Sequence, residues 1–123
     1  MILSSCLDTI TLEDHVKQLN DNCPIDLGGG FVLYGYVIED INVITEIGIN
    51  ESFVASNFIE VHGVEKSKAG FLTNLDDGTK DLFKLMSQEG KGLIIRFIGE
   101  SEENTAELTY TAEEIKTFVK NYL

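Results

Sequence analysis

A single proline and three consecutive glycines separate a segment with helical spacing from a segment with strand-like composition. The stretch Asn22-Cys23-Pro24-Ile25-Asp26-Leu27-Gly28-Gly29-Gly30 contains the only proline of the chain. Proline disfavours helical geometry at the residue before it, so we expect the preceding helix to stop at Cys23. Thr11 and Asp14 resemble a capping box at the start of that helix. Its apolar stripe has helical intervals and consists of Leu12, Val16, Leu19 and Cys23.

The glycine run is not placed as it would be in a phosphate-binding loop. Such loops lie between a strand and a helix, and the N-terminus of that helix binds the anion. Here the helix comes first, and the glycines precede a strand that begins near Phe31. We therefore predict that Gly28–Gly30 forms a tight reversal of the chain rather than a phosphate site.

The rest of the chain predicts two hairpins and further helices. Residues 31–39 and 43–49 are rich in aromatic and β-branched residues and read as a hairpin, while 93–98 and 106–110 read as a second one. In the strand at 43–49, alternation predicts that Val43, Thr45, Ile47 and Ile49 face the core, with Ile44, Glu46 and Gly48 more exposed.

Helical spacing predicts a helix over about 56–75, interrupted by Gly63 and Gly70, and a short helix from Thr79 to Glu89 that ends at Gly90. Thr111 and Glu114 form a capping box that starts the last helix. The predicted order is α-β-β-α-α-β-β-α. We expect one α+β domain over residues 1–123, with an antiparallel sheet of about four strands and helices mainly on one face.

The charge balance restricts the partners that the protein can have. The 123 residues include 21 acidic and 9 basic side chains, a formal net charge of −12. Such a chain repels nucleic acid and anionic membranes unless the fold assembles a basic patch. It suits a basic protein or peptide, although the charge can also serve solubility alone.

The sequence has no recognisable catalytic or metal-binding motif. The two histidines, His15 and His62, are not part of an H-E-x-x-H pattern, and the cysteines do not form C-x-x-C. No serine lies in a G-x-S-x-G context, and the acidic turns lack the ligand spacing of an EF-hand. With 21 acids, a pair of carboxylates remains an open alternative. We predict no catalytic, cofactor or metal residues and a protein that is not an enzyme.

Several residues are candidates for binding another protein, because acids and tyrosines in loops and on strand faces are suited to recognition. Tyr34 and Tyr36 are expected on one face of their strand. Arg96 interrupts an apolar strand and either binds a carboxylate in a cleft or pairs with Glu107 across the hairpin. The acidic candidates are Glu100, Glu102 and Glu103 in one turn and Asp76 and Asp77 in another loop.

The first residues bear on localisation. Leu3-Ser4-Ser5-Cys6 has the form of a bacterial lipobox, but only five residues precede Cys6 and none is basic. We expect a lipid anchor at Cys6 only if the start is truncated, and a cytoplasmic protein if Met1 is the true start. Cys6 and Cys23 form a disulfide in an oxidising compartment or remain two free thiols. No apolar run is long enough to span a membrane.

The motifs Asn22–Gly28, Ile95-Arg96-Phe97-Ile98-Gly99 and Thr111-Ala112-Glu113-Glu114-Ile115 resemble small exported or lipoprotein-like domains of unknown function from gut bacteria. The resemblance extends in layout from Leu12 to Val119 and implies an extracytoplasmic α+β domain without an assigned activity. We therefore expect a binding or accessory module outside the cytoplasm. The alternative is a cytoplasmic acidic inhibitor, such as an immunity protein that covers a basic toxin or enzyme.

Overall fold

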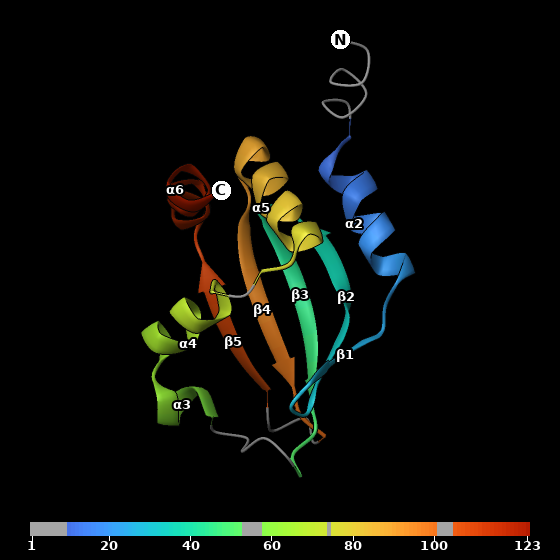
Figure 1. The fold of residues 1–123 in the computed structure, drawn as a ribbon, viewed down its shortest axis with the longest axis vertical. Coiled ribbons are helices and arrows are strands. Elements are labelled where there is room, and N and C mark those ends of the chain that lie inside the picture. Colours follow the sequence, from blue (N-terminus) through green and yellow to red (C-terminus); the bar gives the residue numbers. More distant parts are fainter. Residues whose placement is uncertain (1–9, 53–57, 74, 101–104) are drawn as a thin grey trace.

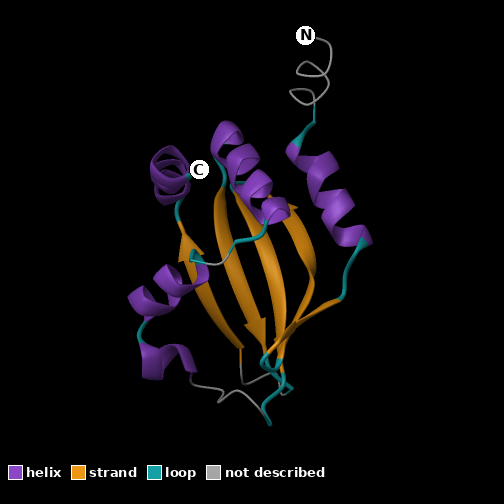
Figure 2. Ribbon diagram, viewed as in Figure 1, coloured by secondary structure: helices purple, strands orange, loops and turns teal. Residues whose placement is uncertain are grey.

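The computed structural model describes residues 10–52, 58–73, 75–100 and 105–123, which form a sheet covered by helices (Figure 1). The helices and strands are shown by type in Figure 2. In chain order they are α2 (Leu12–Asp21), β1 (Ile25–Gly28), β2 (Phe31–Glu39), β3 (Asn42–Ile49), α3 (Phe58–His62), α4 (Val64–Phe71), α5 (Asp77–Glu89), β4 (Gly92–Ile98), β5 (Thr105–Tyr110) and α6 (Ala112–Tyr122).

The α+β class is confirmed, but the predicted antiparallel sheet of four strands is wrong. The sheet has five strands in the order β1-β2-β3-β4-β5. β3 and β4 pair in parallel, whereas the other neighbours are antiparallel. The chain leaves the end of β3 and returns through α3, α4 and α5 to the other end of the sheet, which a parallel neighbour requires. A signal was available in β4, which is a nearly continuous apolar run, as is typical of a strand in a covered parallel pair.

The additional strand is β1, which lies in the stretch that contains the proline and the glycines. Ile25 pairs with Leu33 and Asp26 with Val32, so β1 and β2 form a hairpin. Gly28, Gly29 and Gly30 have φ values of 81°, 64° and 90°, a backbone region that glycine enters without strain. The predicted tight reversal is therefore confirmed, and the segment before it is a short edge strand rather than a loop.

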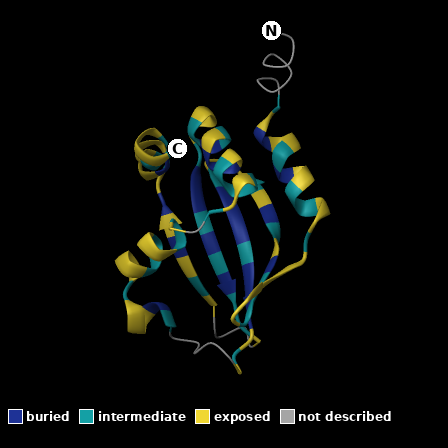
Figure 3. Ribbon diagram, in the orientation of Figure 1, coloured by how far each residue is buried: buried dark blue, intermediate teal, exposed yellow. Residues whose placement is uncertain are grey.

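The described helices pack on one face of the sheet, as predicted (Figure 1). Burial is concentrated along the central strands and the inward side of α5, as Figure 3 shows. The residues at the centre of this core include Val43, Leu82, Phe83, Met86 and Ile95, all of them fully buried. Apolar burial of this kind is the main favourable term in folding.

Local signals define most helix boundaries. The Thr11 hydroxyl accepts a hydrogen bond from the Asp14 N–H (3.1 Å), and α2 ends at Asp21, just before Cys23. Gly90 ends α5 in a left-handed conformation. At the start of α6, the Thr111 hydroxyl accepts a hydrogen bond from the Glu114 N–H (3.1 Å), which confirms the predicted capping box.

Two helix predictions need correction. The helix expected over 56–75 is two helices, because Gly63 has φ 87° and breaks the segment between α3 and α4. The N-cap of α5 is Asp76 rather than Thr79, since the Asp76 carboxylate accepts a hydrogen bond from the Thr79 N–H (2.8 Å). An aspartate that precedes a helix by one residue is a strong N-cap, so α5 begins earlier than predicted.

The second face of the sheet carries the predicted Arg96–Glu107 pair, with a hydrogen bond of 2.8 Å from Arg96 Nε to the Glu107 carboxylate. The expectation that Ile44 and Gly48 are exposed on this face is wrong. Ile44 is 2% exposed and lies between Val37 and Ile94 in the strand register. The Tyr34 ring lies against Gly48, where a β-carbon would meet the phenol oxygen at 2.5 Å. Neighbouring side chains on the same face therefore cover both residues.

Two predictions, one on membrane spanning and one on the cysteines, depend in part on residues that the structure does not describe. Among the described residues, no helix combines the length and the apolar character needed to cross a bilayer. The Cys23 thiol contacts the Leu19 carbonyl at 3.4 Å, and burial raises its pKa. Cys6 lies outside the described residues, so its lipidation and its pairing with Cys23 stay predictions.

Candidate ligand cavity

A β-bulge separates the two tyrosines that were expected on one face of β2. Leu33 pairs with Ile47, but Gly35 pairs with the next residue, Glu46, so Tyr34 is an extra residue in the strand. An extra residue reverses the alternation of the side chains that follow it. Tyr34 is consequently 54% exposed on the outer face, whereas Tyr36 is 8% exposed and points to the helix-covered face. The expectation of a shared face is therefore wrong.

Tyr36 lines a cavity between the sheet and the helices. The cavity has a volume of about 550 Å³ and lies between β1, β2 and β3 on one side and the residues from α4 to α5 on the other. Its walls are mainly apolar, with Leu33, Ile47, Phe71 and Phe83 among them. A volume of this size and an apolar lining are typical of small-molecule sites.

The edge strand β1 forms part of the entrance to the cavity. All four residues of β1 are exposed, yet Ile25 and Leu27 line the cavity. Leu27 is 51% exposed, which is a large exposed fraction for a leucine that faces the covered side of a sheet. On the opposite side, the exposed residues Gly70 and Asp76 also line the cavity. The entrance therefore lies between β1 and the residues that join α4 to α5.

The polar groups of the cavity form a continuous stripe. Tyr36 and Thr45 are direct partners across β2 and β3, and Thr79 and Asp76 come from the start of α5. Burial raises the pKa of the Tyr36 phenol, and hydrogen bonding to Thr79 opposes the rise. Hydrogen bonds from the Thr79 side chain and backbone lower the pKa of Asp76, so this carboxylate is charged at neutral pH.

Thr45 is the least expected member of this stripe. It is 3% exposed and is the one buried polar residue among the described part of the chain. No hydrogen bond to its hydroxyl is formed by any described residue, although the side chain lines the cavity. No fully buried side-chain oxygen or nitrogen of the described residues lacks a hydrogen-bond partner, so the unpaired Thr45 hydroxyl is reached from the cavity and is not sealed in the core. The Thr45 hydroxyl is thus available to a polar group of a molecule in the cavity.

Contacts from α2 hold both polar sides of the cavity in place. Asn20 bonds the backbone of Tyr36 twice: its amide donates to the Tyr36 carbonyl (2.9 Å), and its side-chain oxygen accepts from the Tyr36 N–H (2.7 Å). These bonds satisfy the β2 backbone beside the bulge. A ring nitrogen of His15 lies 2.9 Å from the carbonyl oxygen of Gly78, in the first turn of α5. The polar stripe therefore lies on a preorganised framework.

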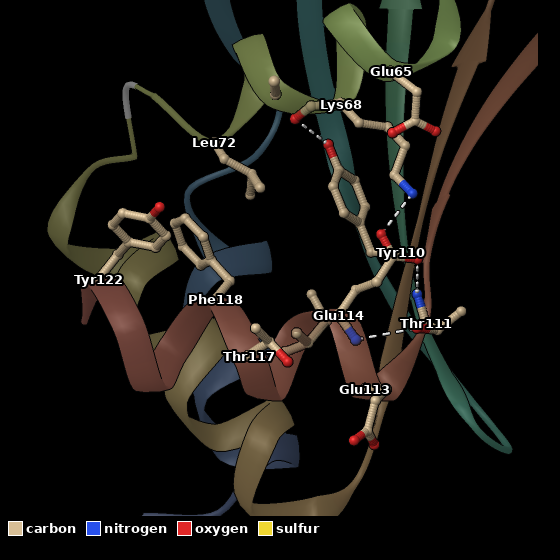
Figure 4. A pocket seen from close by; sticks show the side chains of 12 residues that line it. Glu65, Lys68, Leu72, Tyr110, Thr111, Glu113, Glu114, Thr117, Phe118 and Tyr122 are labelled. Carbon is tan, nitrogen blue, oxygen red and sulfur yellow. Dashed lines mark hydrogen bonds and ion pairs between the residues drawn. The ribbon is translucent and has the colours of Figure 1, made fainter.

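A second hollow, of about 570 Å³, lies between α4 and α6 (Figure 4). Three of its polar side chains, those of Lys68, Tyr110 and Glu114, take part in a connected set of contacts. Lys68 Nζ donates to the Glu114 carboxylate (2.7 Å) and lies 4.9 Å from the centre of the Tyr110 ring, and the Tyr110 hydroxyl donates to the Lys68 carbonyl (2.7 Å). These contacts connect α4, β5 and α6, and they occupy the one basic side chain among the described residues that line this hollow. We therefore favour the cavity that Thr45 lines.

The acidic candidates do not all lie together. Asp76 is at the cavity entrance, and Asp77 is the first residue of α5 and is exposed. Glu100 is exposed just after β4, and Figure 1 places that end of the sheet well below the start of α5. Glu102 and Glu103 lie outside the described residues. The structure thus joins Tyr36 and Asp76, which the sequence had placed in separate groups.

Sequence reasoning missed Thr45, Thr79 and the apolar entrance formed by β1. A signal for Thr45 was present, because a threonine occupies a core-facing position between Val43 and Ile47 in the predicted alternation. A hydroxyl in the apolar face of a strand is a candidate for a buried polar contact. Nothing local to residues 25–28 indicates that they face a cavity, since that depends on α4 and α5.

Comparisons with known proteins identify the fold and leave the family open. No protein-family model and no curated protein matches this chain. A solved structure of similar fold is that of a "putative secreted protein" from Pseudomonas aeruginosa, with a TM-score of 0.61. The match covers 85% of this chain and 88% of the other, with 17% sequence identity. At that level of identity the likeness shows a shared fold alone.

Proposed function

We propose that this protein is a non-enzymatic binding module that acts outside the cytoplasm and holds a small, mainly apolar molecule in the cavity. The observation that carries the proposal is the apolar cavity with an open entrance, to which Thr45 contributes a hydroxyl that makes no hydrogen bond to a described residue. A ligand with an apolar body and a polar head would contact the polar side chains of the cavity and cover the exposed leucine and isoleucine of β1.

The absence of catalysis is part of the proposal and is supported by the composition of the cavity. Its polar residues among the described part of the chain are Tyr36, Thr45, Asp76 and Thr79. This set contains no histidine, cysteine or lysine, and its one carboxylate, that of Asp76, caps α5. The described residues also contain no group of three or more histidine, cysteine, aspartate or glutamate side chains that could hold a metal.

Action outside the cytoplasm is supported by the resemblance of the sequence to exported domains and by the fold shared with the Pseudomonas protein. Fractionation of the native host, followed by detection with an antibody, tests this part directly. We expect the protein in the extracytoplasmic fraction. Detection in the cytosolic fraction alone would contradict this part and leave the cavity proposal in place.

Titration of the folded protein with N-phenyl-1-naphthylamine, a neutral apolar dye whose fluorescence rises in apolar surroundings, tests ligand binding. We expect saturable binding of one dye molecule per chain. Leu27→Asp should weaken binding, because it places a charge at the apolar entrance. Ile41→Asp is the matched control, since Ile41 is 69% exposed in the turn between β2 and β3 and does not line the cavity. Equal binding by the two variants would place the dye elsewhere.

A further inference from the structure

The charge of the cavity restricts the chemical class of its ligand. Asp76 is the only charged residue among the described residues that line the cavity. It lies at the entrance and is exposed, so its carboxylate is accessible to a ligand that enters past β1. An ionised carboxylate of a ligand would meet a like charge there, and an ammonium group would meet an opposite one.

The Asp76 carboxylate has acceptor capacity left for a ligand. The Thr79 N–H donates to one of its oxygens at 2.8 Å, and the Thr79 side chain is a second donor. A carboxylate offers about four acceptor sites on its two oxygens, so sites remain free after both contacts. Hydrogen bonds between an ammonium group and a carboxylate are among the strong ones, because both partners are charged.

The rest of the polar stripe also suits a hydrogen-bond donor. Asp76 is exposed and Thr79 half-buried, while Tyr36 and Thr45 are buried. Each hydroxyl offers acceptor lone pairs as well as a donor. The opposite walls, which include Leu27 and Phe71, are apolar and suit a hydrocarbon body. The stripe therefore favours a ligand with an apolar body and a donor-rich polar head.

On this basis, and resting on the proposed function, we propose that the cavity binds a cationic amphiphile: an apolar molecule whose amine head group contacts Asp76 and the adjacent hydroxyls. The proposal excludes fatty acids and other anionic amphiphiles as preferred ligands. It also assigns Asp76 two roles, as the N-cap of α5 and as the residue that determines ligand charge.

Competition against the dye tests the proposal with three ligands that share one hydrocarbon chain: decylamine, decanol and decanoate. We expect decylamine to displace the dye at a severalfold lower concentration than decanoate, because solvent screens the contact of the amine with the exposed Asp76 carboxylate only in part. Decanol should fall between the two. All titrations stay below the concentrations at which these molecules form micelles, and at neutral pH the amine is protonated.

The decisive variant is Asp76→Asn, because asparagine caps helices about as well as aspartate and should leave α5 intact. It should remove the preference for decylamine over decanoate. Asp77→Asn is the matched control: it makes the same change of net charge one residue away, at a position that does not line the cavity. The control should keep the preference of the unaltered protein.

Each outcome has a defined meaning. Equal displacement by decylamine and decanoate, or stronger displacement by decanoate, would overturn the proposed ligand class. Saturable binding of the dye would still support the proposed function in that case. A preference that is lost to the same extent in Asp77→Asn would also overturn it, because net charge alone would explain the result. Failure of the dye and of all three ligands to bind would instead overturn the proposed function.

Discussion

Glu114 has two separate contacts through a single side chain. Its carboxylate accepts a hydrogen bond from Lys68 of α4 (2.7 Å) and contacts the Thr111 N–H at the start of α6 (3.3 Å). The hydrogen bond from Lys68 is the main reason that the pKa of Glu114 lies below its ordinary value of 4.5. The side chain remains 46% exposed, so solvent screens the pair and the expected contribution to stability is small.

The lowered pKa predicts a pH dependence of stability. Because the folded-state pKa lies below the unfolded value, the contribution is present above pH 4.5 and is lost as the pH falls through the folded pKa. We expect Glu114→Gln to lower the free energy of unfolding at pH 7 more than at pH 3, as measured by urea denaturation. Glu113→Gln is the control, because it removes a charge from the same turn of α6 and leaves the contact between Lys68 and Glu114 in place. An equal pH dependence in the two variants would contradict this assignment.

At the scale of elements, two helical glycines have opposite conformational requirements. Gly90 ends α5 with φ 69° and ψ 35°, a left-handed conformation that costs other residues free energy. Gly70 lies within α4, has no positive φ, and a β-carbon there would meet nothing within 4 Å. The first glycine is required by the backbone, whereas the second only adds conformational entropy to the unfolded chain.

These two positions predict opposite effects of the same substitution. Gly90→Ala should destabilise the protein by about 1 kcal/mol, because alanine in the left-handed region is strained. Gly70→Ala should stabilise it by about 0.5 kcal/mol, because alanine has the better helix propensity. Guanidinium denaturation of the two variants beside the unaltered protein measures both. Destabilisation by Gly70→Ala of the same size as by Gly90→Ala would contradict the position of Gly70 in open space within α4.

At the scale of the whole molecule, the net charge of −12 predicts that the protein does not bind nucleic acid. Two basic side chains are paired with acids, Lys68 with Glu114 and Arg96 with Glu107. We expect no change in the fluorescence anisotropy of a labelled generic duplex at micromolar protein. Binding that weakens as salt is added would overturn this prediction, because it would reveal a basic patch that releases counterions.

Features that depend on neighbours in the sequence could be predicted from the sequence alone. The caps of α2 and α6, the glycine end of α5 and the β1–β2 reversal each depend on a few consecutive residues. The Arg96–Glu107 pair belongs to the same class, because the two residues face each other across a hairpin. In all of these, the interacting groups are close in the chain, so closing the contact costs little entropy and the local sequence carries the signal.

The tertiary structure decided the features that join distant segments. The parallel pairing of β3 with β4 requires the whole crossover through α3, α4 and α5. The inward direction of Tyr36 depends on the bulge at Tyr34, whose neighbouring backbone is satisfied by Asn20 of α2. The cavity exists because the edge strand β1 and the start of α5, which are far apart in the chain, border the same part of the sheet. Packing among segments tens of residues apart selects these arrangements, and no short stretch of sequence contains that information.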